Sequence, residues 1–91
     1  MDKLSFGLSV ETEDRTGEIL AVYFQIRKGR VAKTKEIVEG TVFADFDKEG
    51  KLLGIEMLGP CEVAVLDKIS NSSRVKRFVK ESIPRGMLAT A

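Results

Sequence analysis

The segment 19–26 constrains the fold most, because its side chains are apolar in both phases of a two-residue alternation. It reads Ile-Leu-Ala-Val-Tyr-Phe-Gln-Ile, and a strand that is apolar in both directions is typical of a sheet centre that is covered on both sides. Alternation with the same period marks further strands over residues 4–10, 31–38, 41–47 and 51–58. We therefore expect an antiparallel sheet of four or five strands with 19–26 at its centre.

Short glycine-containing turns predict how these strands connect. The turns are Lys28-Gly29, Glu39-Gly40 and Lys48-Glu49-Gly50, and glycine adopts the positive φ of hairpin loops without strain. Strands that are joined one after another by such turns form a meander. The best match of apolar faces across the last turn pairs Val42, Ala44 and Phe46 with Leu53, Ile55 and Met57.

Helical spacing replaces the alternation after Gly59-Pro60. Apolar residues recur every three positions over 61–69, which predicts a first helix there. The polar break at 71–73 offers an N-cap for a second helix over 74–83, and Pro84 ends that helix.

These patterns predict an α+β fold, an antiparallel four- to five-stranded meander followed by two short C-terminal helices that cover one face. The chain has 91 residues, fewer than the about 100–150 residues of a common domain, so we expect a single domain over 1–91. Within it we expect the β-meander over 1–58, the helical segment over 60–83 and a tail over 84–91.

Composition argues against several classes of function. The chain has 15 basic and 14 acidic side chains and a net charge of +1, so no overall field attracts it to nucleic acid or to an anionic membrane. It has no histidine, the commonest general base and metal ligand. We therefore expect no enzymatic activity, no cofactor and no bound metal. No apolar run approaches the about 20 residues of a membrane span, and the first residues lack a signal-peptide pattern, so we expect a cytoplasmic location.

One stretch matches the pattern of a calcium-binding loop. Asp45, Asp47, Gly50 and Glu56 occupy positions one, three, six and twelve of that pattern, and Glu49 occupies position five. Such a loop needs oxygen atoms that are folded around the ion by a helix on each side, whereas the flanks here alternate as strands do. We therefore interpret the stretch as a hairpin with an acidic tip.

The only cysteine, Cys61, follows Pro60 at a predicted helix N-terminus. That position lowers the pKa of a thiol and favours reactivity. A cysteine nucleophile also needs a base, and because the chain has no histidine we interpret Cys61 as a structural residue.

Charge is distributed unevenly along the chain. Residues 27–38 have a net charge of +4, residues 39–67 of −5 and residues 68–91 of +5. The basic C-terminal segment offers possible phosphate contacts, namely Arg74, Lys76, Arg77 and Lys80. Because neither a recognition-helix signature nor a zinc site accompanies them, we rank nucleic-acid binding behind the interpretation as a solvated helix face.

The stretches 21–27, 29–36 and 43–58 resemble the domain-of-unknown-function family two-two-eight-three, a widespread family of small prokaryotic proteins. The most specific part is the aspartate-rich turn that runs into Leu53-Gly54-Ile55-Glu56. The resemblance covers about residues 4–69 and implies a small prokaryotic β-meander module. It implies no catalytic or cofactor-binding residue.

The second face of the predicted sheet also carries apolar side chains, and two short helices can cover only one face. Apolar residues on an uncovered face suggest that another chain covers them. These possible interface residues are Ile19, Ala21, Tyr23, Phe43, Leu52 and Leu58. We therefore expect a non-enzymatic interaction or structural module that forms a homodimer through this face or an edge strand. The alternative is a nucleic-acid-binding or regulatory accessory protein that uses the basic C-terminal helix.

Overall fold

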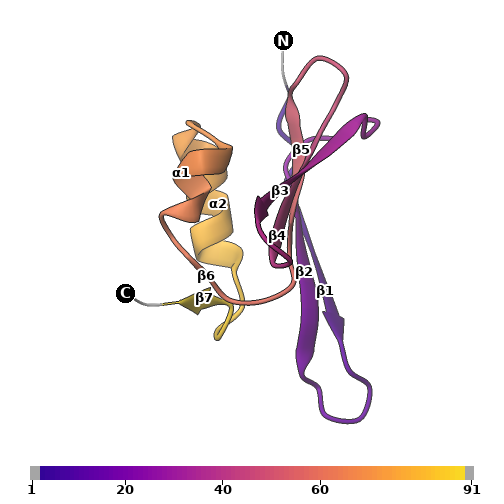
Figure 1. Cartoon of the computed structure of the whole chain (residues 1–91), viewed down its shortest axis with the longest axis vertical. Helices are drawn as coiled ribbons and strands as arrows, with labels where there is room; N and C mark the ends of the chain where they lie inside the picture. The colour runs from indigo at the N-terminus through magenta and orange to yellow at the C-terminus, as the bar shows by residue number, and fades with distance from the viewer. Residues whose placement is uncertain (1–2, 90–91) are drawn as a thin grey trace.

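A five-stranded antiparallel sheet is the main element of the computed structural model, which describes residues 3–89 (Figure 1). The strands are β1 (Gly7–Thr12), β2 (Ile19–Gln25), β3 (Lys33–Val38), β4 (Val42–Phe46) and β5 (Leu52–Met57). Two helices, α1 (Val65–Ile69) and α2 (Ser73–Ser82), follow the sheet. The predicted α+β fold, an antiparallel sheet followed by two C-terminal helices, is confirmed.

The strand order, β1-β2-β5-β4-β3, differs from that of a simple meander because β2 pairs with β5 and not with β3. Lys28-Gly29 is therefore not a hairpin turn. The segment 26–32 instead carries the chain to the far edge of the sheet, where β3 begins, and Gly29 has no positive φ. Gly40 and Gly50 do occupy hairpin turns, with φ of 66° and 85°. Alternation identifies a strand but does not determine which strand it pairs with.

The middle strand of the sheet is β5, whereas the sequence predicts the segment that forms β2. Every residue of β5 except Glu56 is buried. In β2, Val22 and Phe24 are fully buried, but the alternate residues Ala21 and Tyr23 are only partly buried. The reason is that only one face of β2 lies against the rest of the chain.

Two of the three register shifts in the sheet move predicted interface residues away from the face on which simple alternation places them. Strands β4 and β5 keep the predicted register for two of three pairs, but a shift then pairs Phe46 with Leu52 instead of Leu53. A second shift pairs Thr12 with Ile19. One extra residue reverses the side on which the next side chain lies. As a result Leu52, only 7% exposed, belongs to the core and Ile19 packs against it, so the predicted placement of both on the second face is wrong.

The chain after the sheet differs from the predicted first helix and from the predicted tail. Residues 61 and 62 form a short strand, β6 (Cys61–Glu62), and α1 begins only at residue 65. Strand β6 pairs in parallel with β7 (Leu88–Ala89), so the segment predicted as a tail folds back and buries Met87. The end of that segment, residues 90–91, lies outside the described residues. The second predicted helix is confirmed as α2.

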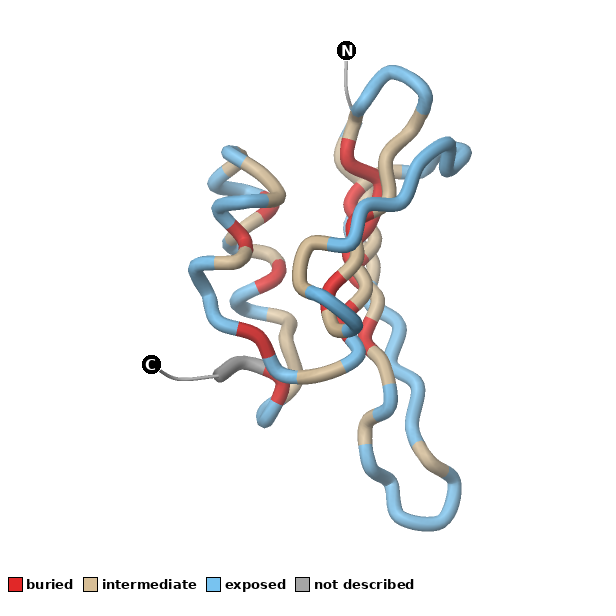
Figure 2. The backbone as a smooth tube through the Cα atoms, viewed as in Figure 1, coloured by how far each residue is buried: buried red, intermediate tan, exposed pale blue. Residues whose placement is uncertain are grey.

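Both helices and the β6–β7 pair lie on one side of the sheet (Figure 1), and the buried residues lie mainly between these two layers (Figure 2). The core combines Val22, Phe24, Ile26, Val42, Ala44, Leu52, Ile55 and Met57 with Cys61, Leu66, Val75, Val79 and Met87. Within residues 3–89 no element covers the opposite side of the sheet, which we call the open face. No helix in this part of the chain is long and apolar enough to cross a membrane.

Candidate interaction surface

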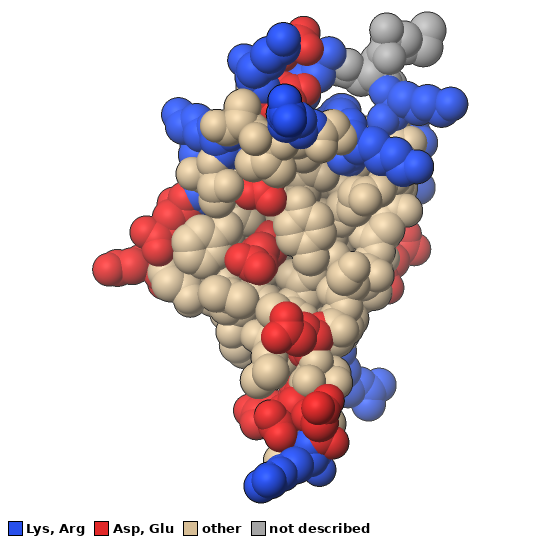
Figure 3. Space-filling model, turned by 90° about the vertical axis from the view of Figure 1, so that its right-hand side faces the viewer, with Lys and Arg blue, Asp and Glu red and all other residues tan. Residues whose placement is uncertain are grey.

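The open face presents two aromatic side chains on either side of a carboxylate. Tyr23 on β2, Glu56 on β5 and Phe43 on β4 are register partners in one row across the sheet. All three are partly buried. We call them the central row. Figure 3 shows the open face, where acidic groups lie within a largely uncharged area.

A hydrogen-bonded network fixes the tyrosine of the central row. The Tyr23 hydroxyl donates to Oδ2 of Asp45 at 3.0 Å, and Oγ1 of Thr34 donates to Oδ1 of the same carboxylate at 2.6 Å. The network joins β2, β4 and β3, and it passes over Gly54 of β5. A β-carbon at residue 54 would lie 1.9 Å from the tyrosine oxygen, so the network requires glycine at this position.

The same environment holds Tyr23 in its protonated form. Burial, followed by the hydrogen bond and the negative charge of Asp45 and then the charge of Glu56, raises the pKa of Tyr23 from 10.0 to about 12. At neutral pH the side chain is therefore a neutral hydrogen-bond donor. A pKa of about 12 lies far above neutral pH, whereas efficient proton transfer needs a pKa near the working pH.

Charged segments of opposite sign lie at the two ends of the sheet. Residues 11–18, which form the β1–β2 turn and its flanks, carry four acidic side chains and one basic side chain. Residues 27–33 carry four basic side chains and no acidic one. Because these two segments flank opposite ends of β2, they lie at opposite ends of the sheet, and Figure 3 shows the two clusters apart. We call residues 11–18 the acidic end and residues 27–33 the basic end.

The structure separates the six predicted interface residues. Three of them lie on the open face: Ala21, Tyr23 and Phe43. Leu58 follows the end of β5, is 46% exposed and lines a shallow cavity together with Ile19 and Met87. Ile19 and Leu52 contact the core, as described above. The apolar part of the open face is therefore smaller than predicted and is centred on two aromatic rings.

The sequence interpretation missed the polar half of this surface, which consists of Thr34, Asp45, Gly54 and Glu56. In the sequence, Asp45 and Glu56 belong to the calcium-loop pattern, and Gly54 and Glu56 belong to the stretch that carries the family resemblance. The signal that identifies them is the strand register, which places them in the phase of Tyr23 and Phe43. Asp47, by contrast, accepts hydrogen bonds from the backbone N–H groups of Glu49 and Lys51, each at 2.9 Å, so it stabilises the hairpin turn. Within the described residues no cluster of three His, Cys, Asp or Glu side chains could hold a metal ion.

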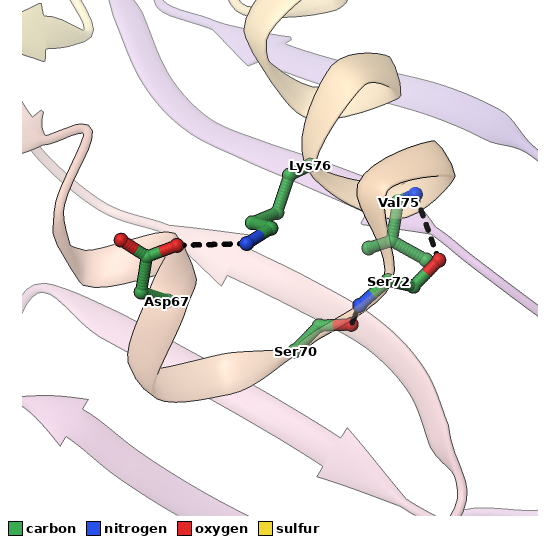
Figure 4. A network of polar contacts seen from close by, with 5 residues as sticks. All are labelled: Asp67, Ser70, Ser72, Val75 and Lys76. Atoms are coloured by element: carbon green, nitrogen blue, oxygen red, sulfur yellow. Dashed lines mark hydrogen bonds and ion pairs between the residues drawn. The ribbon is translucent and has the colours of Figure 1, made fainter.

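The four predicted nucleic-acid contacts lie on α2, in the layer opposite the open face. Three of them are exposed: Arg74, Arg77 and Lys80. The fourth, Lys76, forms an ion pair of 2.9 Å with Asp67 on α1 (Figure 4), and this contact lowers the pKa of the Asp67 carboxyl group. Figure 4 also shows the N-cap of α2, where the Ser72 hydroxyl accepts from the Val75 backbone N–H at 3.3 Å.

The only thiol lies in the core and not on a surface. Cys61 is buried, its Sγ lies 3.7 Å from Sδ of Met57, and burial raises the pKa of the thiol. A thiol with a raised pKa forms little thiolate at neutral pH and is a poor nucleophile. This environment supports the interpretation of Cys61 as a structural residue.

Comparison with known proteins identifies one relationship. A family model described as "Protein of unknown function (DUF2283)" matches residues 14–59, about half of the chain. The matched segment contains β2 to β5 and therefore the whole central row, but it does not include the helices. Comparison with curated proteins found no match, and comparison with solved structures found none either.

Proposed function

Because the chain belongs to the DUF2283 family, whose description states no function, we propose a function from its surface: it is a non-enzymatic module that binds a second copy of itself through the open face. The observation that carries this proposal is the pair of partly exposed aromatic rings, Tyr23 and Phe43, on a sheet face that no described element covers. Aromatic side chains are typical of the centre of protein interfaces. The expected location in a prokaryotic cytoplasm stays a prediction.

The non-enzymatic part of the proposal depends on the chemistry that the side chains offer. The chain has no histidine, its thiol is buried, and its one tyrosine is held protonated with a pKa of about 12. These groups are poorly suited to act as a nucleophile or a base at neutral pH.

Analytical ultracentrifugation at micromolar concentration tests self-association directly. We expect a dimer for the wild-type chain and a weaker one for Ala21→Arg, which places a long charged side chain on the open face without removing an existing contact. The matched control is Leu8→Arg, because Leu8 is an exposed apolar residue of β1 whose register partner, Phe24, lies in the core on the helix side. A wild-type monomer across this range, or equal loss in both variants, would contradict the proposal.

The carboxylate of Glu56 offers a second test. It lies within the central row and would be buried by a second copy, and burial of a carboxylate without a cation is unfavourable. We expect Glu56→Gln to strengthen dimerisation. If the variant instead dimerises more weakly, a cation meets Glu56 and the proposed pairing of two like surfaces is wrong.

The alternative function, nucleic-acid binding through α2, is favoured by its three exposed basic side chains. This alternative is weakened because the fourth basic side chain, Lys76, already forms an ion pair with Asp67. An electrophoretic shift with DNA and RNA at low ionic strength separates the two proposals. Binding that decreases with salt and disappears in Arg74→Glu would support the alternative.

A further inference from the structure

We infer that the second copy binds with its long axis reversed, so that the basic end of each chain lies over the acidic end of the other. This inference rests on the proposed function and adds the orientation of the partner. Two copies that join through one identical face are related by a two-fold axis. If that axis lies in the interface parallel to the long axis of the molecule, like ends meet. If it lies perpendicular to the long axis, opposite ends meet.

The charges of the two ends favour the second orientation. The basic end carries four positive charges, and the acidic end carries four negative charges and one positive charge. In the perpendicular arrangement each dimer contains two such pairs of opposite sign. In the parallel arrangement it contains one contact between two basic ends and one between two acidic ends, which both oppose association.

Because the molecule is long, the charges at each end interact mainly with the second copy and not with the other end of the same chain. The chain is 42 Å long, whereas charges in water at physiological ionic strength are screened over about 8 Å. The two ends of one chain therefore barely interact with each other. Each end responds mainly to the surface that lies directly over it, and a reversed second copy is the surface that carries the opposite charge at both ends.

Charge reversals at the two ends test this orientation. The first variant is Lys28→Glu/Arg30→Glu at the basic end, and the second is Glu11→Lys/Glu18→Lys at the acidic end. All four side chains are exposed, so the fold should tolerate the changes. The matched control is Arg74→Glu/Lys80→Glu on α2, which changes the net charge as the first variant does but lies in the helix layer.

We expect each double variant to dimerise about tenfold more weakly than the wild type at low ionic strength. The basic end has no net charge in the first variant and the acidic end has a net charge of +1 in the second, so the attraction between the ends is lost. The quadruple variant, whose ends have net charges of 0 and +1, should also dimerise more weakly than the wild type. The control should dimerise as the wild type does.

The outcomes separate this inference from the proposed function. If the wild type dimerises but the double variants dimerise equally well, the orientation is wrong. The orientation is also wrong if the double variants dimerise more tightly than the wild type, because they reduce the repulsion between like ends in the parallel arrangement. A wild-type chain that stays monomeric overturns the proposed function and the orientation together.

Discussion

Replacing Gly54 by alanine perturbs the network on the open face at a single point. Gly54 lies on the middle strand, beneath the tyrosine that reaches from β2 to Asp45 on β4. A β-carbon there would lie 1.9 Å from Oη and 2.2 Å from Cζ of Tyr23. Ordinary contact begins near 3.4 Å, so the ring must move by roughly 1.5 Å to restore van der Waals separation. A movement of that size breaks the hydrogen bond of 3.0 Å to Asp45.

The loss of stability follows from two opposing effects. A hydrogen bond to a charged group contributes about 1.5–3 kcal/mol, and the partial exposure of Tyr23 places this bond at the lower limit. Alanine is more favourable than glycine inside a strand by about 0.5–1 kcal/mol, which offsets part of the loss. We therefore expect Gly54→Ala to reduce the free energy of unfolding by about 1 kcal/mol. For a chain of this size that corresponds to a melting temperature lower by about 4–8 °C.

Urea unfolding followed by far-ultraviolet circular dichroism measures this loss, at one fixed protein concentration because self-association also stabilises the folded chain. The control is the same substitution in a Tyr23→Val background, where no ring lies over residue 54. There we expect Gly54→Ala to be neutral or slightly stabilising, so the two sites are coupled. If Gly54→Ala reduces the free energy of unfolding equally in both backgrounds, the position of the Tyr23 ring does not depend on glycine at residue 54 and the reasoning is refuted.

Four further predictions concern the tyrosine, its carboxylate partner, the helix cap and the thiol. Because folding raises the pKa of Tyr23 from 10.0 to about 12, its contribution to stability is present below pH 10 and is lost as the pH rises towards 12; Tyr23→Phe should remove this dependence from urea unfolding curves. In Asp45→Asn the absorbance titration of the only tyrosine should shift to lower pH without reaching 10.0, since burial is the largest cause of the raised pKa; an unchanged titration would contradict the hydrogen bond. Ser72→Ala should reduce the free energy of unfolding by about 0.5–1 kcal/mol through loss of the N-cap, whereas the exposed Ser73→Ala should change it little. A thiol reagent should label Cys61 far more slowly in the native chain than in urea, because the thiol is buried and its pKa is raised; equal rates would show that the residue is accessible.

The strands and the second helix could be predicted because their signals are local. Alternation and a helical apolar stripe concern neighbouring residues, and so does the cap at Ser72. The pairing of β2 with β5 could not be predicted in this way, since it joins segments that are far apart in the sequence. The bulges that redirect Ile19 and Leu52 were missed for a related reason: an extra residue in one strand is visible only against its partner.

The candidate surface shows the same division between local and long-range information. Tyr23 and Phe43 could be predicted as residues of the uncovered face from their phase in their own strands. The role of Asp45 and Gly54 depends on a diagonal contact across three strands, which no single segment encodes. The place of Asp45 in a calcium-loop pattern even pointed to a different chemistry.

The strand order has a consequence for how the chain folds as it is synthesised. The β1–β2 hairpin leaves the ribosome before β5, the strand that completes its pairing, because β3 and β4 are made in between. Until β5 emerges, β2 has one unpaired edge and apolar side chains in both phases, which is a hazard for pairing with other nascent chains. Strands β3, β4 and β5 pair with their sequence neighbours and form early, so the joining of β2 to β5 is the slow step expected for a contact of long sequence separation.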